Sequence, residues 1–159
     1  MEQIEGEIGI SSHTAKHWIS ILEASFILFR PPPYFENFGE RAIKSPKIYF
    51  NDVGLAAYLL GIQDATQLHR DPLRGHLFEN AVILECKKHQ FNQGKNASFF
   101  YYRDLQHHEI DLLYQRGSEL IPIEIKSSKT YHPDFLDQLR HFESIASSRV
   151  PRSTGEISD

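Results

Sequence analysis

The amino-acid sequence predicts a domain of the α/β class, more narrowly α+β, in which helices flank a sheet. From Leu73 onward the hydrophobic pattern predicts a helix, then three strands, then a second helix. Before Leu73, a helical pattern is followed by two short apolar runs on either side of three consecutive prolines. Hydrophobic residues make up 40% of the 159 residues and charged residues 24%, a balance typical of a globular chain.

Composition excludes several classes of protein. No apolar run approaches the roughly 20 residues needed to span a bilayer, and no signal peptide opens the chain, so we expect no membrane association. The single cysteine, Cys86, excludes an internal disulfide and favours a reducing, cytoplasmic location. The formal net charge of -4 argues against a protein that coats nucleic acid through bulk positive charge, but carboxylates also belong to nuclease sites.

The first region, residues 1–61, resembles part of a winged helix. Ser11 or Ser12 begins an amphipathic helix over 12–24, and strands are expected at 26–29 and 47–50. A helix followed by two strands across a proline-rich loop is typical of the second half of that fold.

Two side chains of this first helix, Lys16 and His17, are therefore candidate DNA contacts. The alternative is a helix and hairpin that only pack on the main domain.

The remaining boundaries follow from changes in composition. An apolar helix over 52–60 ends at Gly61, and residues 62–72 form a polar linker. Residues 73–146 make up the main domain. The polar segment 147–159 contains proline and glycine, so we expect a disordered tail there.

The main domain has five expected elements. The first helix contains no proline, and the turn residue Gly117 separates the second strand from the third. In order, these elements are a helix over 73–89, strands over 99–103, 109–114 and 120–126, and a helix over 133–146.

Strand alternation brings acidic and basic groups onto one face of the sheet. In the third strand Glu124 and Lys126 point to the side opposite the three isoleucines. In the second strand Asp111 shares a face with Glu109, opposite Ile110 and Leu112. A hairpin around 116–118 would place Asp111 beside Glu124.

Two carboxylates and a lysine suit a magnesium ion acting on a phosphodiester. Hard divalent cations bind carboxylate oxygens and substrate phosphate, and a nearby lysine can stabilise the charge that develops on phosphate. The alternative is a surface salt bridge between Lys126 and one of the two acids.

The first helix of the main domain adds a third acid. Glu79 and Glu85 both interrupt its apolar arc, and a carboxylate there needs a partner. That partner is either a shared metal or a neighbouring cation, Arg74 or Lys88. We prefer Glu79 as the outer metal ligand.

Histidine and aromatic residues next to these acids have two interpretations. Adjacent strand residues point to opposite faces, so only one of His107 and His108 can face the carboxylates. His107 is predicted to lie on the same face as Asp111 and could add a transition-metal ligand; a surface position in the hairpin is the preferred alternative. Arg103, which follows two tyrosines, could grip nucleic acid, although a half-buried aromatic strand also explains this run.

Several of these motifs together resemble a known family. The segments 73–80, 109–113 and 122–127 resemble the PD-(D/E)xK nuclease-like superfamily. They are most similar to the domain of unknown function that ends many prokaryotic AAA-type ATPases. Residues 45–55 resemble the winged-helix portion of the same group.

The resemblance implies a restriction-endonuclease-like mixed sheet flanked by helices. It further implies Asp111 and Glu124 as metal ligands and catalytic residues, Glu79 as an assisting ligand, and Lys126 in the catalytic position. The implied cofactor is Mg²⁺ or Mn²⁺, and the implied partners are DNA and an ATPase module. This chain has no Gly-x-x-x-x-Gly-Lys-Ser/Thr loop, so we do not expect it to bind ATP by that route.

Two departures from the superfamily pattern affect the expected function. Ile110 stands where the superfamily often has proline, and the segment after Phe142 lacks an apolar strand to complete the sheet. We therefore expect either metal-dependent hydrolysis of DNA or a catalytically inactive DNA- or protein-binding regulatory module. A structural fragment with ordinary ion pairs is the third alternative.

Overall fold

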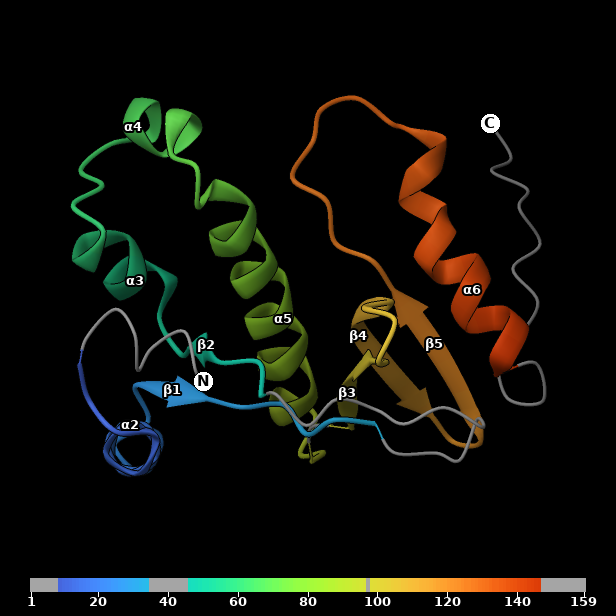
Figure 1. The fold of residues 1–159 in the computed structure, drawn as a ribbon, viewed down its shortest axis with the longest axis horizontal. Helices are drawn as coiled ribbons and strands as arrows, with labels where there is room; N and C mark the ends of the chain where they lie inside the picture. Colours follow the sequence, from blue (N-terminus) through green and yellow to red (C-terminus); the bar gives the residue numbers. More distant parts are fainter. Residues whose placement is uncertain (1–8, 35–45, 97, 147–159) are drawn as a thin grey trace.

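The computed structural model describes residues 9–34, 46–96 and 98–146 and confirms an α+β fold (Figure 1). Its first elements are α2 (Ser12–Ala24), β1 (Leu28–Phe29), β2 (Tyr49–Phe50), α3 (Val53–Leu59) and α4 (Ala65–Arg70). They are followed by α5 (Arg74–Asn92), β3 (Phe99–Arg103), β4 (Glu109–Arg116), β5 (Glu119–Ile123), the 3₁₀ turn η1 (Pro133–Leu136) and α6 (Asp137–Ile145).

The N-terminal elements follow the predicted order with shorter strands. Helix α2 begins after Ser11, whose hydroxyl accepts a hydrogen bond from the Thr14 amide at 3.2 Å. Strands β1 and β2 pair antiparallel over two residues each, rather than the four expected. The two strands still form the hairpin that the proline-rich connection predicted.

The polar stretch 62–72 contains a short helix that the sequence analysis did not predict. The Asp64 carboxylate accepts hydrogen bonds from the amides of Thr66 and Gln67 and so caps α4. The available signal was Asp64 itself, because aspartate is a preferred residue at the start of a helix.

The main sheet has the strand order β3-β4-β5, and both pairings are antiparallel. The turn between β4 and β5 contains Gly117 with φ +62°, a conformation that favours glycine. Strand β5 ends at Ile123, so Glu124 and Lys126 follow the strand instead of lying within it.

Strand β4 contains a β-bulge at its centre. Phe100 pairs with Leu113 and Tyr102 with Ile110, so Asp111 and Leu112 together stand opposite Tyr101 alone. The alternation predicted for this strand is interrupted as a result. Asp111 lies on the α5 side of the sheet, opposite Ile110 as predicted, but Leu112 also packs on the α5 side, which corrects the prediction that it faces the other way.

The main sheet lies between two helices, with α5 on one face and α6 on the other (Figure 1). Two groups of buried residues fill these layers. On the α6 side are Tyr34, Tyr102, Ile110, Leu113, Leu120, Phe142 and Ala146; on the α5 side are Tyr49, Ile83, Phe99 and Leu112.

The N-terminal region shares this core. Tyr49 of β2 is buried against Ile83 of α5, and the Tyr34 amide donates to the carbonyl of Tyr101 at 2.8 Å. The change of composition at 62–72 therefore does not coincide with a break in packing. The predicted tail, 147–159, lies outside the described residues.

None of the helices in the described part of the chain has the length and hydropathy required to cross a bilayer.

Candidate functional site

Lys47, just before β2, lies among three carboxylates. Its ammonium nitrogen is 2.9 Å from Glu79 Oε1, 2.9 Å from Asp111 Oδ1 and 2.5 Å from Glu109 Oε1. The Lys47 side chain is only 10% exposed. We call Lys47, Glu79, Glu109 and Asp111 the carboxylate cluster; it joins the N-terminal hairpin, α5 and β4.

Two further side chains extend the carboxylate cluster. The Tyr49 hydroxyl donates to Glu79 Oε1 at 2.5 Å, and Arg103 Nε donates to Glu109 Oε2 at 2.6 Å. Lys47 and Tyr49 are two residues apart and so point to the same side of the extended segment.

The electrostatics of the carboxylate cluster hold Lys47 in its charged form. Burial by itself lowers the pKa of Lys47, but the oxygens of Tyr49 and of the three carboxylates outweigh burial and raise that pKa. Burial raises the pKa of the Tyr49 hydroxyl, the charge of Lys47 opposes this, and Glu79 raises the pKa further, so the hydroxyl stays protonated and remains a donor.

Asp111 also connects the carboxylate cluster to the segment after β5. Its second oxygen, Oδ2, accepts a hydrogen bond from the Ile125 amide at 3.0 Å. Next along the chain, Glu124 Oε1 accepts from Lys126 Nζ. The structure thus brings together the three residues that the resemblance marked as catalytic.

Glu124 is the least satisfied of these acids. Its side chain is 8% exposed, and Oε2 is buried with no hydrogen-bond partner among the described residues. Burial raises the pKa of the Glu124 carboxyl and the negative charge of Asp111 raises it further, whereas Lys126 and the backbone of Asp111 lower it. An acid in this environment favours a proton or a bound cation at Oε2.

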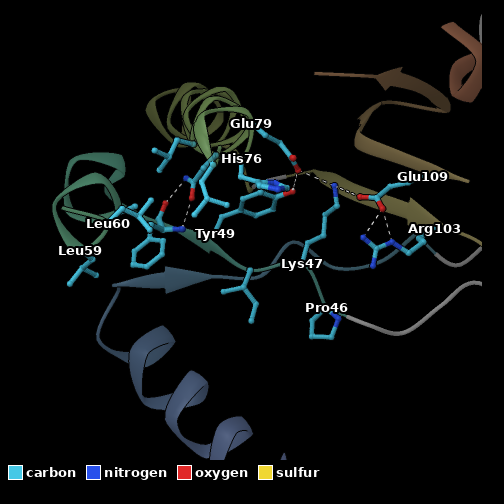
Figure 2. A pocket seen from close by; sticks show the side chains of 15 residues that line it. Pro46, Lys47, Tyr49, Leu59, Leu60, His76, Glu79, Arg103 and Glu109 are labelled. Atoms are coloured by element: carbon cyan, nitrogen blue, oxygen red, sulfur yellow. Dashed lines mark hydrogen bonds and ion pairs between the residues drawn. The ribbon is translucent and has the colours of Figure 1, made fainter. Parts of the chain in front are cut away.

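A cavity of about 520 Å³ lies between α3, α5 and β2 and opens onto the carboxylate cluster (Figure 2). The polar and aromatic side chains that line it include Lys47, Tyr49, His76, Glu79, Arg103 and Glu109. The rest of the lining is mostly apolar: Ile48, Phe50, Ala56, Leu59, Leu60, Leu73 and Leu77.

The predicted ligands Glu79, Asp111 and Glu124 are not gathered around a single point. Within the described ranges, no set of three oxygens from these residues and Glu109 lies within 4.8 Å of one another, whereas Lys47 bridges Glu79 and Asp111. Glu85, the alternative acid on the same helix, pairs with Lys88 at 2.7 Å on the exposed surface.

The predicted nucleic-acid contacts fall in two separate places. Arg103 borders the cavity and binds Glu109. Lys16 and His17 are exposed on α2, which packs against β1 and lies well away from β4 in Figure 1.

Sequence reasoning missed Lys47 and Tyr49. The available signal was a lysine and a tyrosine at alternate positions of an extended segment whose other residues are apolar. Alternation placed both on one face, but the sequence did not show that Glu79, 32 residues away, would face them.

The fold and this site define an α+β domain with a buried, lysine-bridged group of carboxylates beside a cavity. The chain belongs to the family described as domain of unknown function DUF4143, whose model matches residues 74–155. A second model, domain of unknown function DUF8612, matches residues 1–66. The resemblance to a domain of unknown function is thereby confirmed.

The chain is also similar to two mycobacterial proteins. They are the uncharacterized protein Rv2008c of Mycobacterium tuberculosis and the uncharacterized protein Mb2031c of Mycobacterium bovis, each 30% identical over 128 residues. The match covers 80% of this chain and 28% of each relative, so the chain spans less than a third of their length. No solved structure matches the chain.

Proposed function

We propose that this chain is the nuclease-like domain of a prokaryotic AAA-type ATPase and hydrolyses DNA phosphodiesters with Mg²⁺ or Mn²⁺. The observation that supports the proposal most strongly is the buried, unpartnered Oε2 of Glu124 beside Asp111 and Lys126. The resemblance to PD-(D/E)xK nucleases independently assigns catalysis to these three residues.

The donor set fits a hard divalent cation. Asp111 and Glu124 offer oxygen atoms only, and a cation at Glu124 Oε2 would satisfy an atom that has no hydrogen-bond partner within the described ranges. The cation would polarise the phosphodiester and lower the pKa of water. Glu79 would join these two ligands once Lys47 no longer holds it.

The remaining chemistry belongs to Lys126. Its side chain is partly exposed, and beside a bound phosphate its ammonium group would stabilise the negative charge that develops as water attacks phosphorus. One P–O ester bond breaks, a new P–O bond forms to the water oxygen, and a proton passes to the leaving alkoxide. Asp111, fixed by the Ile125 amide, orients the site.

A second function is favoured by Lys47. Its ammonium group already contacts Glu79, Glu109 and Asp111 and offsets part of their negative charge, which is how a site that has lost its metal would be stabilised. In this alternative the chain is a catalytically inactive DNA- or protein-binding regulatory module of the same ATPase.

Calorimetric titration with Mn²⁺ tests the proposal. We expect the wild-type chain to bind Mn²⁺, and Asp111→Asn to weaken binding by more than about 100-fold, because even outer-shell changes cost 10–100-fold. Asp134→Asn, at an exposed position of η1, is the matched control and should bind like wild type.

Cleavage of a DNA panel in Mn²⁺ then separates the two functions. Turnover that is lost in Lys126→Ala, but kept in the exposed control Lys129→Ala, supports the enzyme. A folded wild-type chain that binds no Mn²⁺ would overturn the enzyme reading. Salt-sensitive DNA binding without turnover would then favour the regulatory module.

A further inference from the structure

We propose that Asp104, His108 and His141 form a second cation site, for a transition metal of the Zn²⁺ type. Asp104 and His108 lie in the turn between β3 and β4, and His141 lies on α6. The site is on the α6 side of the main sheet, whereas the carboxylate cluster is on the α5 side.

Three ligand atoms converge at this point. His108 Nδ1 is 2.8 Å from Asp104 Oδ2, His141 Nε2 is 3.5 Å from the same oxygen, and one ligand atom from each residue lies within 4.8 Å of the others. The two imidazole rings are stacked, with centroids 3.6 Å apart and planes inclined by 22°. Within the described ranges, this is the one such group of three.

The spacing of these atoms suits tetrahedral coordination. Zinc bonds of about 2.0–2.1 Å place neighbouring ligand atoms about 3.3 Å apart. The two distances to Asp104 Oδ2, 2.8 and 3.5 Å, lie on either side of that value. Binding a cation would therefore lengthen the distance from Asp104 to His108 and shorten the distance from Asp104 to His141, while the two ring nitrogens, which lie within 4.8 Å of one another, adjust to the same ion.

The turn that carries two of the ligands is already rigid. Asp104 Oδ1 accepts from the His108 amide at 2.8 Å, and the Asp104 amide donates to the His108 carbonyl at 3.0 Å. Between them His107 adopts φ +67°, a left-handed conformation that is uncommon for residues other than glycine. Asp104 itself is completely buried, as metal-ligating carboxylates often are.

Helix α6 presents the third ligand from an equally fixed position. Phe142, next to His141, is completely buried against Tyr102, and Gln138 Oε1 accepts from the Glu109 amide at 3.2 Å. These contacts hold the helix against the start of β4. Preorganised ligands lose little entropy when a metal binds.

An ion pair alone does not explain the arrangement. Asp104 and His108 form a complete hydrogen bond, but His141 Nε2 is buried and has no hydrogen-bond partner in the described part of the chain. A cation shared by both rings and the carboxylate would satisfy His141. Two imidazoles and one carboxylate favour Zn²⁺, Co²⁺ or Ni²⁺ over Mg²⁺, and leave a fourth position for water.

The expected consequence is a metal clasp between the β3–β4 turn and α6. Because the ligands come from a turn and a helix that are separated along the chain by β4 and β5, binding would stabilise the folded chain and raise its melting temperature. This role is independent of the proposed hydrolysis.

Titration of the purified chain with Zn²⁺ and Co²⁺ tests the proposal. We expect one tightly bound Zn²⁺ per chain, a higher melting temperature, and visible d–d absorption of the Co²⁺ form typical of low-symmetry coordination. His141→Gln should weaken Zn²⁺ binding by more than about 100-fold. His13→Gln, at an exposed position of α2, is the matched control.

Two further variants make the outcome decisive. Asp111→Asn should retain the Zn²⁺ site, which separates it from the carboxylate cluster, and His108→Gln should lose it. Unaltered Zn²⁺ affinity in both histidine variants, or no Co²⁺ absorption in the folded wild type, would overturn the proposal. The Co²⁺ spectrum requires no variant to fold.

Discussion

At the scale of single residues, Lys47 controls the charge of the candidate site. Three carboxylates from α5 and β4 lie within 2.9 Å of its ammonium nitrogen. Carboxylates this close to one another repel unless a cation lies between them. The Lys47 ammonium group therefore offsets the repulsion between Glu79 and Asp111, whose side chains are both largely buried.

Removal of this ammonium group should be costly. We expect Lys47→Met to lower the free energy of unfolding by about 3 kcal/mol, because loss of one partner leaves buried charge uncompensated. Urea unfolding monitored by circular dichroism measures the change. Added Mn²⁺ should recover more stability in Lys47→Met than in wild type, because the cation no longer competes with lysine.

The matched control is Lys88→Met. Lys88 pairs with Glu85 at 2.7 Å, but both side chains are more than half exposed, so the change should be below about 1 kcal/mol. Equal destabilisation by the two substitutions would contradict the role given to Lys47.

At the scale of secondary-structure elements, the bulge in β4 and the end of β5 shape the site. The bulge directs Asp111 toward α5 without moving Leu112 out of the core. Because β5 stops at Ile123, the Ile125 amide is free of the ladder and donates to Asp111 instead. Bulges next to functional sites commonly redirect a side chain in this way.

Helix α5 holds β2 in place through one amide side chain. Asn80 Oδ1 accepts from the Phe50 amide at 2.8 Å, and Nδ2 donates to the Phe50 carbonyl at 2.9 Å. Asn80 is 5% exposed and pairs with this strand edge as a neighbouring strand would.

Asn80→Ala should therefore destabilise the chain by about 2 kcal/mol, because two buried backbone groups lose their partners. Thermal or urea unfolding measures the loss. Asn92→Ala, at the exposed end of α5, is the control and should be nearly neutral. An unchanged free energy of unfolding in Asn80→Ala would mean that water replaces the side-chain amide at this strand edge.

At the scale of the whole molecule, the N-terminal region and the main sheet form one packed unit. Tyr49 lies in the same core as Ile83 and Leu112, and Lys87 Nζ lies 3.9 Å from the centre of the Phe29 ring. Lys87 also donates to Asn51 at 2.6 Å. Contacts of this kind couple the unfolding of the two regions.

We accordingly expect a single cooperative unfolding transition. Trp18, the one tryptophan, lies on α2 and reports on the N-terminal region, whereas far-UV circular dichroism reports on the whole chain. The two probes should give the same urea midpoint. A separate, earlier transition of Trp18 fluorescence would show that the N-terminal region unfolds on its own.

Much of the local structure was predictable from the sequence. The Ser11 cap, the turn at Gly117 and the order of elements from 73 to 146 follow from patterns within a few residues. Such patterns are reliable because capping, positive φ and side-chain periodicity are local properties. Helical periodicity likewise predicted that Glu79 needs a partner, because it interrupts the apolar arc of its helix.

The identity of that partner depended on tertiary structure. Lys47 and Asp111 are 64 residues apart, and only the packing of the hairpin against α5 and β4 brings them together. The bulge and the approach of His141 to Asp104 are likewise products of three-dimensional packing. The sequence by itself determined the class of fold and the acids of the site. Tertiary structure decided which cation lies between those acids, because contacts between distant segments have no periodic signal along the chain.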